Sequence, residues 1–209
     1  MDTRTKTFSF EYAGRTLSIE IGKLAQQADG SVLVRYGDTT ILATAVSPYK
    51  KRNEDINFLP LTVDYEEKLY AAGKISGSRF IKREGRPSDD AILNSRLIDS
   101  PLRPLFPKGY FCDVQVIVTV LSYDQENNSR VPSLIAASLA LSISDIPWDG
   151  PLGIAMVGMH EGALILNPSE SQLKASDLEL VVVSSKERVV MIEAGASQVP
   201  QDKVLAAIE

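Results

Sequence analysis

The first 64 residues form a succession of short alternating segments separated by turn signals, which limits the possible folds more than any other feature. Residues 8–12 and 16–21 alternate apolar and polar side chains around Ala13–Gly14. Residues 31–36 and 39–46 flank Gly37–Asp38, a two-residue hairpin signal. Residues 58–64 predict one more strand. Hairpins without intervening helices argue against a strict strand–helix alternation.

Helices enter later in the chain. Ser88 followed by two aspartates predicts a helix cap, and Pro101 predicts that this helix stops at Asp99. The remaining segments predict strands at 114–121, 150–159, 163–166, 178–184 and 189–193, and helices at 132–144, 169–175 and from Pro200 onward. We therefore predict an α+β fold with mixed β-sheets packed against helices. No internal repeat or linker is visible, so residues 1–209 are expected to be a single domain.

Size and composition set the broad class. The chain has no apolar run long enough to cross a membrane and no secretory or transit signal at its start. Its one cysteine, Cys112, cannot form an internal disulfide, so we expect a reducing cytoplasm. A final helix that begins near Pro200 and stops at Glu209 suggests a fragment of a longer protein.

A local basic segment contrasts with the acidic whole. The chain carries a net charge of −5, yet Lys68 to Arg86 holds six lysines and arginines and one acid, Glu84. Phe80 lies inside this cluster. Arginines contact phosphates and an aromatic ring stacks on bases, so the composition suits single-stranded nucleic acid. The alternative is a solvated surface loop.

A second basic group follows at a helix end. Arg96 and Asp99 share a helical face, and Arg103 comes after the proline. Two arginines at such a corner can bind a phosphate through paired hydrogen bonds. The alternative is an arginine–aspartate pair that ties the helix end to a loop, and the sequence leaves both readings open.

Other motifs favour structural roles. Residues 73–77 lack the spacing of a nucleotide-binding P-loop, and the lone His160 is expected in a surface turn. No cluster of histidines and cysteines exists to hold zinc. Asp64, Glu66 and Glu67 follow a strand and are expected to be solvated charges, with Mg²⁺ binding as the alternative.

Several motifs taken together are more specific. VDYEEKLYAAGKI, FIKREGRPS and RLIDSPLRPLFPKG, in this order and spacing, resemble the first ribonuclease PH-type core of the bacterial polynucleotide phosphorylase family. The segments VRYGDTTILATAV and IPWDGPLGIAMVG are also similar to it. The resemblance covers nearly all of residues 1–209.

The resemblance implies a ribonuclease PH-like core, the ribosomal protein S5 domain 2-like fold. It implies a phosphate-dependent 3′→5′ exoribonuclease, acting in mRNA degradation, that turns RNA and inorganic phosphate reversibly into nucleoside diphosphates. Members of the family are homotrimeric rings that work with RNA-degradation partners in the cytoplasm. In them the second core binds phosphate and Mg²⁺, while the first core supplies an aperture loop that grips RNA.

The aperture loop matches residues 80–83, with departures. The family usually has two aromatics and two arginines there, whereas this chain has Phe80, Ile81, Lys82 and Arg83 and is one residue longer at Arg79. Ser100 stands where the family usually has an arginine. The residues that the resemblance implies for RNA binding are Arg79, Phe80, Lys82, Arg83, Arg86, Arg96 and Arg103.

No catalytic residue and no metal ligand is predicted in this chain. Asn128–Ser129–Arg130 stands where a phosphate loop would precede a helix, but the region after Val181 offers only Glu187 and Glu193 as acids. The preferred hypothesis is a core that guides RNA and supports the ring, with little activity as an isolated fragment. An autonomous phosphorolytic enzyme and a purely structural assembly module remain alternatives.

Overall fold

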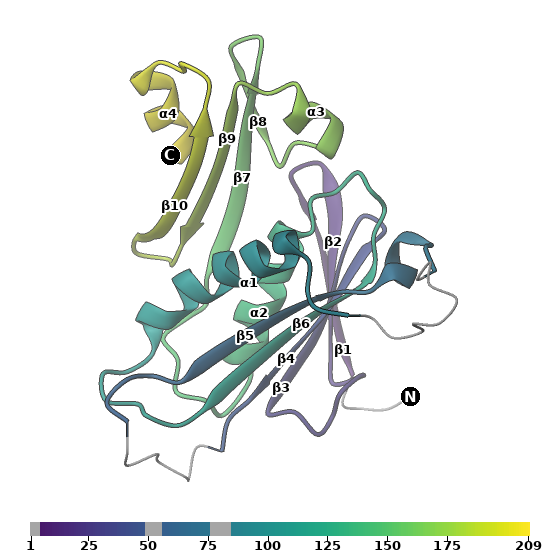
Figure 1. Ribbon diagram of the computed structural model, residues 1–209, viewed down its shortest axis with the longest axis vertical. Coiled ribbons are helices and arrows are strands. Elements are labelled where there is room, and N and C mark those ends of the chain that lie inside the picture. The colour runs from purple at the N-terminus through teal and green to yellow at the C-terminus, as the bar shows by residue number, and fades with distance from the viewer. Residues whose placement is uncertain (1–4, 49–55, 76–84) are drawn as a thin grey trace.

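The computed structural model describes residues 5–48, 56–75 and 85–209, which form two sheets (Figure 1). The six-stranded sheet has the order β1-β2-β3-β4-β6-β5 and the four-stranded sheet the order β10-β9-β7-β8. The six-stranded sheet consists of β1 (Lys6–Tyr12), β2 (Arg15–Ile21), β3 (Gly30–Tyr36), β4 (Thr39–Val46), β5 (Leu61–Glu67) and β6 (Val114–Ser122). The four-stranded sheet consists of β7 (Gly153–His160), β8 (Ala163–Leu166), β9 (Leu178–Ser184) and β10 (Val189–Ala196).

The helices follow the later strands. They are α1 (Asp89–Leu102), α2 (Arg130–Ser142), α3 (Glu170–Lys174) and α4 (Gln201–Ile208), with short 3₁₀ turns η1 (Leu69–Ala72) and η2 (Arg103–Leu105). β5 pairs parallel with β6, whereas the other neighbouring strands pair antiparallel. The predicted α+β class with mixed sheets is therefore confirmed.

Helices α1 and α2 pack against the six-stranded sheet, α1 on β5 and α2 on β3 and β4. The second sheet approaches them through β7 and β10, so both helices lie between the two sheets (Figure 1). Small residues bring α2 close to β3. A side chain at Gly30 would collide with the backbone carbonyl of Ala140, so this position needs glycine.

One large apolar core joins the two sheets. It contains Val116 and Val118 from β6, Leu134 from α2 and Val181 and Val183 from β9, all essentially buried. A smaller cluster lies under α4, where Ala207 covers Leu178 and Leu180. The burial of α2 on nearly every side explains why its sequence is rich in alanine, leucine and serine.

The predicted end of helix α1 was wrong. It continues to Leu102 with Pro101 inside it, instead of stopping at Asp99. A proline in the last turn removes only one backbone hydrogen bond, and the amide of Arg103 still bonds to the carbonyl of Asp99. The predicted cap is confirmed, because the Ser88 hydroxyl accepts a hydrogen bond of 3.0 Å from the Ala91 amide.

Strand β5 begins and ends three residues later than predicted. Parallel pairing with β6 sets its bounds, since Leu61 faces Val114 and Glu67 faces Val120. Because the last residues of the strand include two acids, sequence analysis did not assign them to it, although Tyr65 among them is buried. The long loop expected after residue 68 also contains the 3₁₀ turn η1.

Candidate nucleic-acid interface

The basic segment is anchored firmly where it leaves the sheet. After β5 the chain turns through η1 and ends this turn at Gly73, which has a φ of 69° that glycine adopts freely. The Tyr123 amide donates to the Ala71 carbonyl at 2.9 Å, which ties η1 to the end of β6. The Lys68 ammonium lies 3.1 Å from the Glu66 carboxylate. Lys74 and Ile75 then extend into solvent.

The start of α1, which follows the basic segment, lies beside the end of β5. The Ser88 hydroxyl, which caps α1, also donates to the Glu67 carboxylate at 3.3 Å. The end of β5 and the start of α1 therefore meet at the base of the segment. Arg86 is exposed beside this base. The candidate residues Arg79, Phe80, Lys82 and Arg83 lie outside the described residues.

Arg96 lies on the solvent side of α1. It forms one exposed row with Asp89, Leu93 and Ser100, at helical spacing from each other. Within the described ranges its guanidinium makes no hydrogen bond or ion pair. Arg96 is therefore available to a phosphate as the structure stands.

Arg103 is used differently. Its Nη2 and Nε donate to the two oxygens of Asp99 at 2.7 and 3.2 Å. Its Nη1 and Nη2 also donate to the carbonyls of Leu59 and Leu61 at 3.0 and 3.2 Å. The structure thus has the arginine–aspartate tie that sequence analysis left open, and Arg103 is engaged in it. RNA contact by Arg96 or Arg103 stays a prediction.

The loop before α2 is bound by its own chain. The Arg130 guanidinium donates to the Glu179 carboxylate at 2.8 Å and to the Asn94 side chain at 3.1 Å. The Asn128 side chain donates to Glu170 at 3.0 Å and accepts from the Arg130 amide at 2.9 Å. The Arg130 guanidinium and the Asn128 side chain, two groups that could hold an anion at this helix start, therefore already have protein partners.

Two tyrosines line the same region. The Tyr65 hydroxyl donates to the Ser129 hydroxyl at 2.8 Å. Burial raises the pKa of Tyr65 to about 12, although the Ser129 hydrogen bond opposes this. Burial, followed by the nearby carboxylates of Glu170, Asp124 and Glu67, raises the pKa of Tyr123. Both phenols stay protonated at neutral pH and can donate hydrogen bonds.

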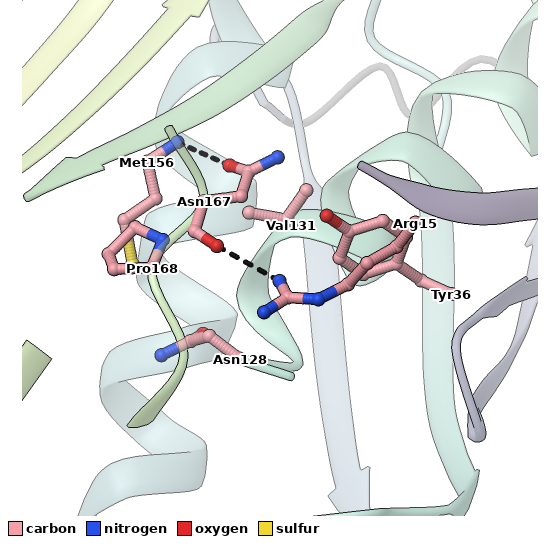
Figure 2. A pocket seen from close by; sticks show the side chains of 7 residues that line it. All are labelled: Arg15, Tyr36, Asn128, Val131, Met156, Asn167 and Pro168. Atoms are coloured by element: carbon pink, nitrogen blue, oxygen red, sulfur yellow. Dashed lines mark hydrogen bonds between the residues drawn. The ribbon is translucent and has the colours of Figure 1, made fainter. Parts of the chain in front are cut away.

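Sequence analysis missed the seam between the two sheets, which Figure 2 shows. Arg15 donates to the Asn167 carbonyl at 2.9 Å, and its guanidinium lies 5.7 Å from the centre of the Tyr36 ring. The Asn167 side chain accepts from the Met156 amide at 2.9 Å. The residues that line this seam leave no room for a water-sized molecule. It is a structural joint, and no sequence motif marks it.

Asp64, Glu66 and Glu67 were expected to follow a strand, but they lie within β5, and they do not converge. Asp64 accepts a hydrogen bond of 3.1 Å from Gln115, while Glu66 and Glu67 contact Lys68 and Ser88. Among the described residues, no three histidines, cysteines or acids group as a metal site would require. His160 is exposed, as predicted, but it is the last residue of β7 and pairs with Ala163 instead of lying in the turn. Within the described residues, no helix is long and apolar enough to cross a membrane.

This arrangement of sheets and helices defines a ribonuclease PH-type fold. It resembles a chain of the Archaeoglobus fulgidus exosome with RNA bound to the active site, with a TM-score of 0.69 and 20% identity over 93% of this chain and 83% of the other. At that identity the likeness shows the fold alone.

Sequence comparison identifies the family. The 3′ exoribonuclease family, domain 1, matches residues 13–147, and domain 2 of the same family matches residues 150–209. The chain therefore belongs to the 3′ exoribonuclease family.

Curated relatives are also similar along the whole chain. The polyribonucleotide nucleotidyltransferase of Shouchella clausii is 55% identical over 208 residues, which is 100% of this chain and 29% of the relative. That of Heliobacterium modesticaldum is 55% identical over 97% of this chain and 28% of its own length. The resemblance noted in the sequence is confirmed as homology. The chain spans less than a third of the length of these relatives.

Proposed function

We propose that this chain is the first ribonuclease PH-type core of a phosphate-dependent 3′→5′ exoribonuclease acting in mRNA degradation. In this proposal the core guides single-stranded RNA and supports a trimeric ring, while phosphorolysis takes place elsewhere in the longer protein. Homology to polyribonucleotide nucleotidyltransferases supports the reaction class. The assignment to the first core rests on the motifs around residues 65–107.

The state of the loop before α2 is the observation that carries the non-catalytic role. A phosphorolytic site must bind inorganic phosphate, and the start of α2 would be the place to bind it. Here the Arg130 guanidinium donates a hydrogen bond to Glu179, and the Asn128 side-chain amide donates one to Glu170. A phosphate would have to displace two carboxylates, which carry the same sign of charge. This arrangement supports RNA guidance over catalysis.

The anchored basic segment supports RNA binding. A polyanion approaches an acidic protein only where positive charge is concentrated. The base of the segment is held by Ser88 and Glu67, Arg86 is exposed beside it, and Arg96 is exposed further along α1. We therefore assign single-stranded RNA to this surface, with the aromatic Phe80 as a stacking partner.

The remaining parts of the proposal concern the longer protein. It would form a homotrimer, hold Mg²⁺ in its second core, use inorganic phosphate, release nucleoside diphosphates and act with RNA-degradation partners in the cytoplasm. We also propose that residues 1–209 act as one domain, which is supported by the apolar core shared by both sheets.

An activity assay on the purified 209-residue chain tests this role. The chain is incubated with a homopolymeric RNA, inorganic phosphate and Mg²⁺, beside a full-length homologue as positive control. We expect little or no release of nucleoside diphosphates, because the Arg130 and Asn128 side chains at the candidate phosphate site already bond to carboxylates. Robust, Mg²⁺-dependent release would establish an autonomous enzyme instead. The same preparation should bind single-stranded RNA in a salt-dependent way, and complete absence of binding would favour an assembly module.

A further inference from the structure

The 3₁₀ turn η1 and the residues directly after it expose an apolar patch. Leu69 and Tyr70 are 40% and 59% exposed, and Ile75 is 94% exposed. The turn lies at the outer margin of the molecule, beyond the end of β5 (Figure 1). Single exposed apolar side chains are common on protein surfaces, but three within one short segment indicate a contact surface.

The turn is held rigidly, so its side chains are positioned before any ligand arrives. The Gly73 amide donates to the Tyr70 carbonyl at 3.0 Å and closes the turn. The Tyr123 amide donates to the Ala71 carbonyl at 2.9 Å, which joins the turn to the end of β6. Ala71 also packs against the main apolar core. A side chain on such a preorganised turn loses little freedom on binding.

Tyr70 is the member of the patch that can recognise a ligand by shape. Within the part of the chain that the structure describes, neither its ring nor its hydroxyl has a partner. A tyrosine ring presents a flat face, and the bases of single-stranded nucleic acids stack on such faces whatever their sequence. Leu69 and Ile75 offer apolar contact but no flat face. A nucleobase is therefore the group that fits this turn.

The charges around the turn separate the base from the phosphate. Lys74 directly follows η1, is exposed and has no carboxylate partner among the described residues. Glu66 and Glu67 lie just before the turn, and two aspartates begin α1 nearby. Carboxylates repel a phosphate but not an uncharged base. The base is therefore expected at Tyr70, and the phosphate beside it at Lys74.

We propose that Tyr70 stacks on a base of single-stranded RNA and that Lys74 contacts the adjoining phosphate. This inference rests on the proposed RNA-guiding function and adds a stacking position to it. Tyr70 closely follows Glu67 and Arg86 closely precedes Ser88, and Glu67 and Ser88 are hydrogen-bonded. One RNA strand can therefore contact Tyr70, Lys74 and Arg86 at the base of the basic segment.

Titration of a single-stranded oligoadenylate into the 209-residue chain at low salt tests the stacking. We expect Tyr70→Ala to weaken binding at least about fivefold, because the ring face is lost. Tyr70→Phe keeps that face and should bind as the unmodified chain does. Phe58→Ala is the matched control, because Phe58 is 61% exposed but precedes the start of β5, whereas η1 follows its end.

An abasic oligomer of the same length separates stacking from charge. It keeps the sugars and phosphates but has no bases, so the unmodified chain and Tyr70→Ala should bind it equally. Lys74→Ala should instead weaken binding to both oligomers. Its slope of log affinity against log salt concentration should be shallower by about 0.7, because one phosphate contact is lost. Tyr70→Ala should leave that slope unchanged.

The possible outcomes distinguish this inference from the proposed function. No RNA binding by the unmodified chain would refute the proposed function and the stacking together. RNA binding that Tyr70→Ala leaves unchanged would overturn the stacking alone, and so would a Tyr70→Phe variant as weak as Tyr70→Ala. Sedimentation equilibrium supplies the last comparison. If Tyr70→Ala weakens self-association and not RNA binding, the patch is a contact between copies of the chain and the inference is wrong.

Discussion

At the residue scale, Asp124 holds together two loops that lie 86 residues apart in the sequence. Its carboxylate accepts hydrogen bonds from the Asp38 amide at 3.2 Å and from the Glu126 and Asn127 amides at 2.9 and 2.8 Å. Burial raises the pKa of this carboxyl, but the hydrogen bonds from Asn127 and Glu126 lower it by more, so the net shift is downward. The charged form therefore stabilises the fold.

The sign of this shift gives a prediction for Asp124→Asn. A carboxyl with a lowered pKa stabilises the folded state above its ordinary pKa, and this contribution is lost as pH falls below about 4. We expect the variant to lose about 1–3 kcal/mol of unfolding free energy at pH 7, because its amide nitrogen cannot accept hydrogen bonds. The difference from the unmodified chain should shrink between pH 5 and 3.

Urea unfolding at several pH values measures this difference. Asp38→Asn is the matched control, since Asp38 is exposed in the same turn and its carboxylate makes no hydrogen bond within the described residues. A loss for Asp124→Asn that stays constant from pH 7 to pH 3 would contradict the proposed role of its charge.

At the element scale, the end of α1 depends on Arg103. Its planar guanidinium bonds to Asp99 within the helix and to two carbonyls that flank the start of β5. A lysine keeps the charge but cannot reproduce this fork. We expect Arg103→Lys to cost about 1–2 kcal/mol of unfolding free energy, with the backbone carbonyls contributing more than the exposed ion pair.

Arg96→Lys is the control for that substitution. Arg96 is exposed on the same helix, so its replacement should change stability by less than about 0.5 kcal/mol. Urea midpoints of the two variants measure the contrast. If Arg103→Lys is as stable as Arg96→Lys, the observed tie contributes nothing, and an RNA contact becomes the main reason for Arg103.

The sequence predicted the type of nearly every element, because periodicity and turn residues are local signals. The Gly37–Asp38 hairpin and the Ser88 cap were predicted by such signals. Bounds set by distant partners were missed: β5 is positioned by β6, and α1 continues through Pro101. In the candidate site, Arg130 was recognised, but its partner Glu179, 49 residues away, was not. The only feature that could have drawn attention to Glu179 is its position between two leucines, Leu178 and Leu180, which are buried in the structure.

At the scale of the whole molecule, the proposed RNA surface lies at the β5 edge of the six-stranded sheet. Of the described candidates, Arg86 precedes α1 and Arg96 lies on it, and α1 packs on β5. The seam of Arg15, Tyr36 and Asn167 joins the two sheets and keeps them in one body (Figure 2).

The last prediction concerns how RNA affinity depends on assembly. In the proposed trimer, three basic segments would surround one pore and concentrate positive charge there. Phe80 would stack on a base, contributing about 1–3 kcal/mol. Lys82 and Arg83 would contact phosphates with little dependence on base sequence. An isolated chain should therefore bind single-stranded RNA weakly, and the assembled protein more tightly.

Titrations of single-stranded RNA at two salt concentrations separate these contributions. The assembled protein is compared with Phe80→Ala, with Lys82→Ala/Arg83→Ala, and with Arg188→Ala as a control in the exposed turn between β9 and β10. The double variant should lose affinity. Its slope of log affinity against log salt concentration should be shallower by about 1.4, because the loss of two phosphate contacts releases fewer counterions. Phe80→Ala should lose affinity with its slope unchanged, since stacking releases no counterions. Identical binding by all four proteins would mean that the basic segment is an ordinary surface loop.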